Sequence, residues 1–347
     1  MAAPGYPWAT TVGPSSTAPL PILSSRRPLQ IILLGLGTVG LGVYRELLRR
    51  PDLFEIRRIA VQHPAKHIAA GIDPMLLTRD VFAAIAEPAD MVIELLGGHQ
   101  PAASAIEGAL AAGRIVVTAN KELIASTVEH FEAVASRSGG GLRYSASVGG
   151  AVPMIEAVAR VQLGTHEHNA VTSLRGVVNG TCNFILGELE NGASLEDAVA
   201  LAQAKGFAEQ DPASDLSGAD AAAKLRILAR CVLGEEAPRV TFSGVDELTP
   251  NRARVARRAG RRLKLLAEFR RTSLKPVLTV SLAEITTDDW LADCNAECNA
   301  LEIEMADGSL HRLFGLGAGR FPTTASVIAD VYDAWRGFIG SPAASWR

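Results

Sequence analysis

The chain has 347 residues, of which 48% are hydrophobic and 20% are charged, and its formal net charge is −3. This length and apolar content suit two domains with cores of their own and exclude a disordered protein. The small negative charge excludes a general basic field for nucleic acid or anionic lipid. No apolar run approaches the ~20 residues that span a bilayer, so we expect a cytoplasmic protein with small-molecule partners.

The ordered fold is expected to begin after residue 28. Residues 1–28 are rich in Pro, Ser, Thr and Ala without hydrophobic periodicity, which predicts a flexible leader. The apolar run at 29–34 predicts a strand buried on both faces, and residues 41–50 have helical spacing. Between them stands GLGTVG at 35–40, whose glycines allow a tight turn, a close approach of pyrophosphate and close helix packing. This unit predicts a dinucleotide site.

A second predicted strand, at residues 55–61, bears on the choice of nucleotide. It ends in Val61-Gln62-His63, where enzymes that bind NAD place an acid on the adenosine ribose. No Asp or Glu stands there, and Lys66 and His67 follow. The sequence therefore favours NADP, with NAD possible.

Two further apolar strands are predicted at 91–96 and 115–118. They end in Gly97-Gly98 and in Ala119-Asn120-Lys121, and ligands of such sheets lie beyond the strand C-termini. Lys121 precedes a predicted helix at 122–136, where a cation is unfavourable beside the positive helix end. A ligand carboxylate or a reacting oxygen would explain the lysine.

The segment GFAEQDPASDLSGADAAAK at 206–224 is rich in acids before a helix that should start near Ala219. Asp215, Ser217 and Asp220 could cap that helix. Asp220 and Lys224 would share one stripe of it, one turn apart. The segment therefore indicates a polar active site, and an ordinary capped helix with a surface ion pair is the alternative.

Lysine usage favours the active-site interpretation. The chain has six lysines against 28 arginines, so a lysine on a half-buried face suggests a need for its titratable proton. Nucleotide composition of the source would also produce an arginine excess. Together Lys121 and Lys224 would bring two ammonium groups to one site, and each should lower the pKa of the other.

Many arginines also occur between residues 252 and 264. Helical spacing of Val255, Ala259, Leu263 and Leu266 predicts an amphipathic helix with a solvated basic face. Nucleic-acid binding is the alternative that we reject. The four cysteines form no CxxC pair, which predicts reduced structural thiols.

Six motifs, spaced and ordered alike, resemble the homoserine dehydrogenase family. They are GLGTVG at 35–40, ELLGG at 94–98, ANK at 119–121, GVVNGTCNFIL at 176–186, GFAEQDPASDLSGADAAAKLRILA at 206–229 and GLGAGRFPTTASVIADV at 315–331. The resemblance covers nearly everything after residue 28. It implies an α/β protein with a Rossmann-type parallel-sheet nucleotide-binding domain at 29–147 and a mixed α/β substrate and dimerisation domain at 148–314. A C-terminal segment at 315–340 would return to the first domain.

The same resemblance implies a reaction and its residues. The reaction is the reversible reduction of L-aspartate 4-semialdehyde to L-homoserine by NAD(P)H, in a homodimer. Lys224 would transfer the proton, Lys121 would be the second catalytic lysine, and Asp220 would order both. The implied substrate-binding residues are Thr181, Gly180, Glu209, Asp215 and Asp220, and the implied cofactor-binding residues are Gly35, Gly37, Thr38, Val39, Gly40, Gly97, Thr118, Asn120, Lys121, Gly206 and Gly319.

Two positions depart from the family pattern. Ser145 stands where members commonly have a glutamate, in a segment whose backbone carbonyls bind a monovalent cation. The backbone carbonyls of Val148, Gly150 and Val152 could still coordinate sodium weakly, but the loss of a charged oxygen ligand counts against that site. Phe207 replaces the commoner tyrosine. Two alternatives therefore stay open: a dehydrogenase of the same fold acting on a related amino aldehyde, and a catalytically impaired nucleotide-binding relative.

Overall fold

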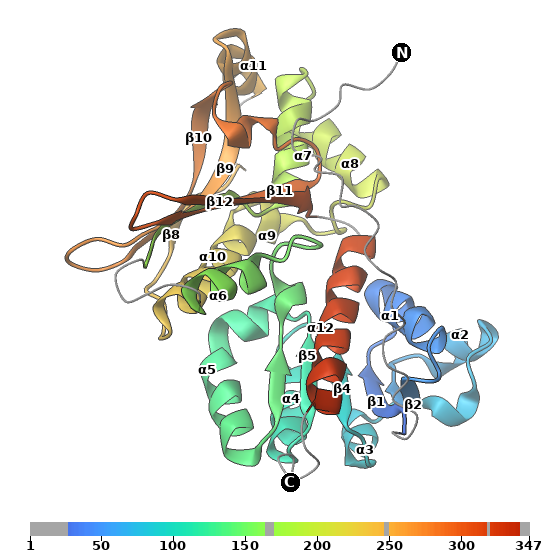
Figure 1. Ribbon diagram of the computed structural model, residues 1–347. Helices are drawn as coiled ribbons and strands as arrows, with labels where there is room; N and C mark the ends of the chain where they lie inside the picture. The colour runs from blue at the N-terminus through green and yellow to red at the C-terminus, as the bar shows by residue number, and fades with distance from the viewer. Residues whose placement is uncertain (1–26, 164–169, 246–249, 318–319, 341–347) are drawn as a thin grey trace, which may run out of the picture.

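The computed structural model describes residues 27–163, 170–245, 250–317 and 320–340 (Figure 1). Most of the predicted leader, residues 1–26, lies outside the described residues. Within the described part of the chain, no helix combines the length and apolarity that a membrane crossing requires.

The first half of the chain forms a parallel six-stranded sheet in the order β3-β2-β1-β4-β5-β6. Every residue of β1 but Gln30 is buried, as expected for a strand covered by helices on both sheet faces. The strand order reverses between β1 and β4, and ligands of such sheets bind at that point. The Rossmann-type prediction is confirmed. The strands are β1 (Leu29–Leu34), β2 (Phe54–Ala60), β3 (Leu77–Thr78), β4 (Met91–Glu94), β5 (Ile115–Thr118) and β6 (Gly141–Arg143), and the helices are α1 (Thr38–Leu48), α2 (Pro64–Ala69), α3 (Val81–Ala86), α4 (Ala102–Ala111) and α5 (Lys121–Ser138).

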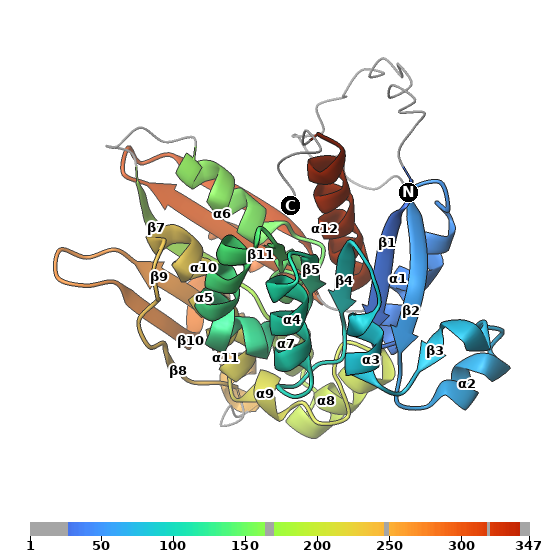
Figure 2. The same cartoon turned by 90° about the horizontal axis from the view of Figure 1, so that it is seen from below.

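A second six-stranded sheet, in the order β12-β11-β7-β9-β10-β8, follows. Its pairs are antiparallel except β10 with β8, and α10 packs against β9 and β10. Figure 2 shows this sheet beside the first domain, with α5, α6 and α10 between them. The strands are β7 (Val171–Val177), β8 (Thr241–Phe242), β9 (Arg261–Arg270), β10 (Val277–Thr286), β11 (Cys298–Met305) and β12 (Leu310–Leu316), and the helices are α6 (Met154–Leu163), α7 (Gly180–Glu190), α8 (Leu195–Ala204), α9 (Ala213–Leu216), α10 (Ala219–Leu233) and α11 (Pro250–Arg258).

The predicted helix through Leu263 and Leu266 is wrong beyond its first half. Helix α11 ends at Arg258, Gly260 has a left-handed φ of +69°, and β9 begins at Arg261. A left-handed glycine is a common helix stop. Strand β9 is buried on both faces from Leu263 to Ala267, so its sequence does not alternate between apolar and polar residues. Without that alternation, the apolar positions were also consistent with a helix.

The last described helix, α12 (Arg320–Gly340), packs against α1 (Figure 1). Tyr332 meets Phe54 of β2 edge to face, with ring centroids 5.4 Å apart. The Asp330 carboxylate accepts a hydrogen bond of 2.9 Å from the backbone N–H of Ser145. The chain thus returns to its first domain, while the boundaries at 147/148 and 314/315 stay a prediction.

Candidate active site

The glycine loop after β1 has the geometry of a phosphate-binding turn. Gly35 has a φ of +94°, and a Cβ there would lie 2.5 Å from the carbonyl oxygen of Leu95. A Cβ on Gly40 would overlap the carbonyl of Gly35. A Cβ on Gly37 would meet no atom within 4 Å, and Gly37 caps α1 without a side-chain hydrogen bond. The first N–H groups of α1 therefore face an open space that suits an anion.

The two predicted cofactor residues at the end of β1 differ in exposure. Thr38, the first residue of α1, is exposed, whereas Val39 is half-buried and packs with the core of the first domain. The neighbouring tip of β2 presents Gln62, His63 and Lys66 to solvent. Since none of these is an acid, the tip fits NADP as well as NAD.

Glu94 organises the C-terminal ends of β4 and β5. It is completely buried, and its carboxylate accepts hydrogen bonds from the Thr118 hydroxyl at 2.6 Å and from the Gly97 N–H at 3.2 Å. Burial raises the pKa of Glu94, and the Thr118 bond is the largest effect opposing that rise. Within the motif ELLGG, this acid had no predicted role. An acid at the end of an apolar strand was the signal.

Asn120 links the two strand tips and starts α5. Its side chain donates to the Gly98 carbonyl at 2.7 Å, and its backbone N–H donates to the Thr118 hydroxyl at 3.0 Å. Its Oδ1 accepts from the Leu123 N–H at 3.3 Å, which caps the helix. Lys121 is therefore the first residue of a helix whose start is fixed by Asn120.

The two suspected lysines meet at one carboxylate. Lys121 of the first domain binds Oδ1 of Asp220, and Lys224 binds Oδ2 at 2.8 Å. Lys224 also donates to the Val178 carbonyl at 2.9 Å. Asp220 is 6% exposed, so the three charges form a largely buried cluster. This arrangement brings together the residues predicted to be catalytic.

Asn179 connects this cluster to a second acid. Its Nδ2 donates to Asp220 at 2.8 Å and to Asp215 at 2.7 Å, and its Oδ1 accepts from the Cys182 N–H at 2.7 Å, capping α7. One amide thus holds two carboxylates and a helix start. Within the motif GVVNGTCNFIL, Asn179 had no predicted role. An amide between an apolar strand and a helix was the available signal.

The expectation that Asp215, Ser217 and Asp220 would cap α10 is wrong for the carboxylates. Gly218, with a φ of +83°, occupies the cap position, and no side chain bonds the helix end as a cap. Ser217 makes a long 3.5 Å contact with the N–H of Ala219. The carboxylates bind the lysines and Asn179 instead. Hydrogen bonds from charged ammonium groups are stronger than those from backbone N–H groups, and Asn179 is a buried donor.

The pKa of Lys121 differs from the expectation that a neighbouring lysine would lower it. Burial opposes the charge on Lys121, but attraction to Asp220 outweighs it and raises the pKa of Lys121. Burial also opposes the charge on Asp220, but Lys224 and Lys121 together hold its pKa well below the ordinary range. Burial and the neighbouring Asp220 raise the pKa of Asp215. The carboxylate of Asp220, which both lysines share, causes the difference.

The remaining predicted substrate residues are placed less closely together. Gly180 is buried at the start of α7, and Thr181 next to it donates its hydroxyl to the Phe207 carbonyl at 2.5 Å. Gly206 has a φ of +75° and is exposed, as is Glu209. Glu209 makes no side-chain bond to the lysine cluster within the described ranges. Gly319 lies outside the described residues.

The backbone sodium site stays a prediction. Val148 and Val152 are buried, and Gly150 has a φ of +63°. The Val152 carbonyl already accepts a bond of 2.8 Å from the Met154 N–H. In the described part of the chain, no three or more His, Cys, Asp or Glu residues are grouped so as to hold a metal ion.

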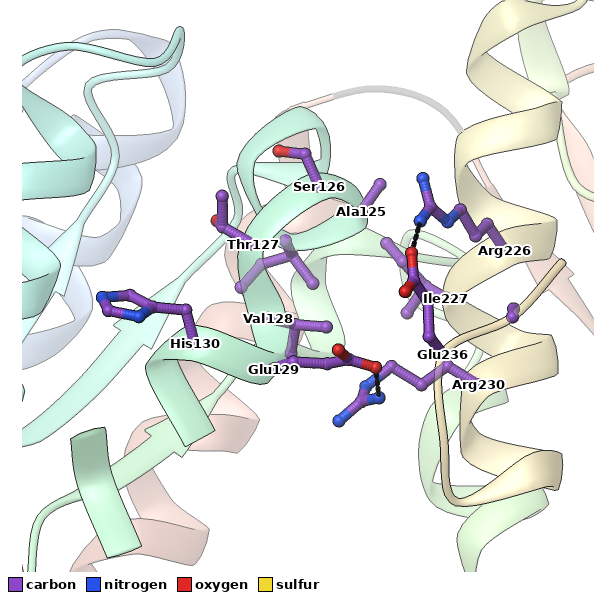
Figure 3. Close-up of a pocket in the computed structure, with 12 residues that line it drawn as sticks. Ala125, Ser126, Thr127, Val128, Glu129, His130, Arg226, Ile227, Arg230 and Glu236 are labelled. Carbon is purple, nitrogen blue, oxygen red and sulfur yellow. Dashed lines mark hydrogen bonds and ion pairs between the residues drawn. The ribbon is translucent and has the colours of Figure 1, made fainter. Parts of the chain in front are cut away.

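A cavity of about 260 Å³ lies between α5 and α10 (Figure 3). On both helices its lining residues follow the lysines Lys121 and Lys224 in the sequence. Its charged side chains pair with one another: Arg226 with Glu236 at 2.6 Å, and Arg230 with Glu129 at 2.7 Å. The lining of this cavity contains no lysine, and both of its glutamates are paired with arginines. We therefore place the chemistry at that cluster and not in this cavity.

Two family models match the chain. The homoserine dehydrogenase model matches residues 153–332, and the model of the homoserine dehydrogenase NAD binding domain matches residues 35–145. The chain belongs to the homoserine dehydrogenase family. It is thus an NAD(P)-dependent oxidoreductase, and the resemblance seen in its motifs is confirmed.

Individual members of the homoserine dehydrogenase family agree with this assignment. The homoserine dehydrogenase of Pseudomonas aeruginosa is 35% identical over 91% of this chain and 74% of its own length. That of Corynebacterium glutamicum is 34% identical over 88% of this chain and 72% of its own. The solved homoserine dehydrogenase of Thiobacillus denitrificans superposes with a TM-score of 0.82 and 33% identity, covering 92% of this chain and 77% of that one.

Proposed function

We propose that this protein catalyses the reversible NAD(P)H-dependent reduction of L-aspartate 4-semialdehyde to L-homoserine. The observation that carries the proposal is the pair of lysines, one from each domain, bound to the single carboxylate of Asp220 beside the strand tips of the nucleotide-binding sheet. Two ammonium groups fixed at the C-terminal edge of such a sheet suit a reaction in which an aldehyde oxygen gains negative charge.

Bound nicotinamide supplies the hydride, and the side chains of the cluster manage charge and proton. Lys224 donates a hydrogen bond to the aldehyde oxygen and gives it a proton as the alcohol forms. Lys121 adds positive charge at the same place. Asp220 keeps both amines oriented, and Asn179 fixes Asp220 in turn. Exclusion of water strengthens each of these interactions.

The polar groups around the cluster suit an amino acid as substrate. Asp215, held beside the cluster by Asn179, is the acid placed for the substrate ammonium, and the exposed Glu209 is the second acid that we propose for it. The N-terminus of α7, where Gly180 and Thr181 lie, offers backbone N–H groups and a positive helix end to the carboxylate. These substrate roles are proposals that the positions of the residues support.

The choice of nucleotide, the assembly and the location are part of the proposal. Because Gln62 and His63 leave the ribose end without an acid and Lys66 lies nearby, we expect NADPH to be preferred to NADH. We propose a homodimer. The cytoplasm is the proposed location, in keeping with four cysteines that are all free thiols.

The test is turnover by the full chain. Oxidation of NADPH and of NADH is followed with L-aspartate 4-semialdehyde, and nucleotide reduction with L-homoserine. We expect turnover in both directions and a higher kcat/KM with NADPH. Measurable nucleotide binding without turnover of either substrate would contradict the proposal, and turnover only of another amino aldehyde would support the alternative substrate.

The Lys224→Ala variant tests the role of the amine. We expect kcat to fall by roughly 10²- to 10⁴-fold with a small change in KM, because the group acts in the transition state. Lys275→Ala, which removes an exposed lysine on another loop, is the matched control and should keep wild-type kcat. An effect on KM alone would assign Lys224 to substrate binding and not to proton transfer.

A further inference from the structure

The arginine-rich stretch at 252–264 is not used by the reaction site, yet the fold gathers it around a cavity. This cavity, of about 340 Å³, lies between α7, β9 and the segment before β11, and its wall includes Arg257, Arg262 and Lys264. Asn183, Asn191 and Asn295 add amide groups to the same wall. A second cavity, also about 340 Å³, shares Glu190, Asn191 and Arg257 with the first and adds Arg254 and Arg258. We call the two together the basic cavity.

Lys264 is the deepest cation of the basic cavity. It is 4% exposed, and its ammonium donates to Oδ1 of Asn183 at 2.9 Å and to the carbonyl of Cys294. Both partners are neutral oxygens. Burial lowers the pKa of Lys264, Glu190 and the thiols of Cys294 and Cys298 oppose that effect, and Arg262 adds to it. A buried ammonium without a bonded carboxylate is unfavourable unless something else compensates its charge.

Two acids, Glu188 and Glu190, line the first cavity, and neither bonds the ammonium of Lys264. Glu190 accepts from the Leu263 N–H at 2.9 Å and pairs with Arg262 at 3.2 Å. Arg257 binds only neutral oxygens, the Glu190 carbonyl at 3.3 Å and the Asn191 side chain. Among the described residues, therefore, neither Arg257 nor Lys264 has an ion-pair partner, although both line the same cavity.

We propose that the basic cavity is a binding site for a small phosphate-bearing anion, either inorganic phosphate or a phosphomonoester. Arginine forks and a lysine ammonium together match the several oxygens of a phosphate group. The phosphate binds at Lys264 and Arg257. The shared wall lets the remainder of the ligand extend toward Arg254 and Arg258.

The site is separate from the reaction centre but connected to it through α7. Asn179, at the start of that helix, holds Asp215 and Asp220, and Asn183, one turn later, holds Lys264. An anion that draws Lys264 toward the cavity therefore acts on the helix that fixes the catalytic acids. Nucleic acid, the alternative for an arginine-rich surface, would engage the exposed arginines without needing the buried lysine.

The experiment titrates inorganic phosphate into the full chain, with ³¹P NMR and melting temperature as readouts at constant ionic strength set by chloride. We expect saturable binding and a rise in melting temperature that chloride does not give. Arg257→Ala and Lys264→Met should each weaken binding at least tenfold. Arg239→Ala, which removes an exposed arginine between α10 and β8 and outside the basic cavity, is the matched control and should bind as wild type.

Further arms decide between ligand sources. Glycerol phosphate competing with phosphate identifies a phosphomonoester site, and phosphate binding alone identifies an inorganic phosphate site. Arg257 is exposed and bonds only Glu190 and Asn191 at the end of α7, so it can be changed even if Lys264→Met does not fold. The proposal is overturned by absence of saturable phosphate binding, by equal losses in Arg257→Ala and Arg239→Ala, or by oligonucleotide binding that Lys264→Met leaves unchanged.

Discussion

Asn179 shows how one neutral side chain organises a charged site. Its amide lies between Asp215 and Asp220, two acids that would otherwise repel each other in a buried place. The bond from Asn179 lowers the pKa of Asp215, against burial and Asp220, which raise it. The amide therefore favours two charged acids beside the two lysines.

Replacement of Asn179 should separate this role from helix capping. Asn179→Ala removes both, whereas Asn179→Ser keeps a capping oxygen but cannot reach the two acids. We expect both variants to lose roughly tenfold or more in kcat/KM, and the acidic limb of the kcat/KM profile to move to higher pH, because the pKa of Asp215 rises without its donor. Only Asn179→Ala should lose about 1 kcal/mol of capping stability. A wild-type pH profile for Asn179→Ser would show that Asn179 is only a cap.

Residue types alone predicted much of this site but not its connections. The scarcity of lysine and the half-buried stripe singled out Lys224, and the unfavourable helix start singled out Lys121. Their meeting at Asp220 could not be predicted from spacing, because 99 residues separate Lys121 from its partner. The expected lowering of the Lys121 pKa is wrong for that reason, because attraction to Asp220 raises it. No role was predicted for Glu94 or Asn179, because buried acids and amides serve structural hydrogen bonding as often as they serve a reaction.

At the scale of elements, buried strands were predicted well where their ends carried glycine or polar turns. The strand at 115–118 has the predicted bounds, and the strand predicted at 55–61 is shifted by one residue. Strand β9 was mistaken for helix because both of its faces are buried. The length of an apolar run does not distinguish a doubly buried strand from a buried helix.

The docking of α12 gives a prediction in pH. Burial raises the pKa of Asp330 to about 6 from an ordinary 3.8, Glu156 adds to the rise, and the Ser145 bond and Arg143 oppose it. The native state therefore binds more protons than the unfolded chain between these values, so this group costs stability as pH rises through that window. Asp330→Asn, whose amide oxygen can still accept from Ser145, removes the cost.

Asp330→Asn should raise the free energy of unfolding at pH 7.5 by on the order of 2 kcal/mol, and the gain should largely vanish near pH 4. Thermal unfolding at both pH values measures it. Asp333→Asn, on the same helix but exposed and paired with Arg336, should show no such pH-dependent gain. If Asp330→Asn were destabilising at pH 7.5, the carboxylate would be stabilising α12 despite its burial.

At the scale of the whole molecule, the catalytic cluster exists only because the two domains pack together. Helix α5 of the first domain lies against α10 of the second, which places the first residue of one beside the first turn of the other. Local patterns predicted each helix. They could not predict this contact, because packing between distant elements leaves no periodicity in the sequence.

Assembly gives the last prediction. Strand β12 forms a seven-residue edge of the second sheet, and Leu310, Phe314 and Leu316 on one of its faces are 49%, 54% and 50% exposed. An exposed apolar edge of this length suits a second copy of the chain. Light scattering after gel filtration should therefore give twice the chain mass of 36.6 kDa for the wild type.

The double variant Phe314→Lys with Leu316→Lys should shift the measured mass to that of the monomer, since burying two ammonium groups at an interface is unfavourable. Phe242→Lys, at the opposite two-residue edge β8, should leave the dimer intact. A double variant that stays dimeric would assign the interface to another surface.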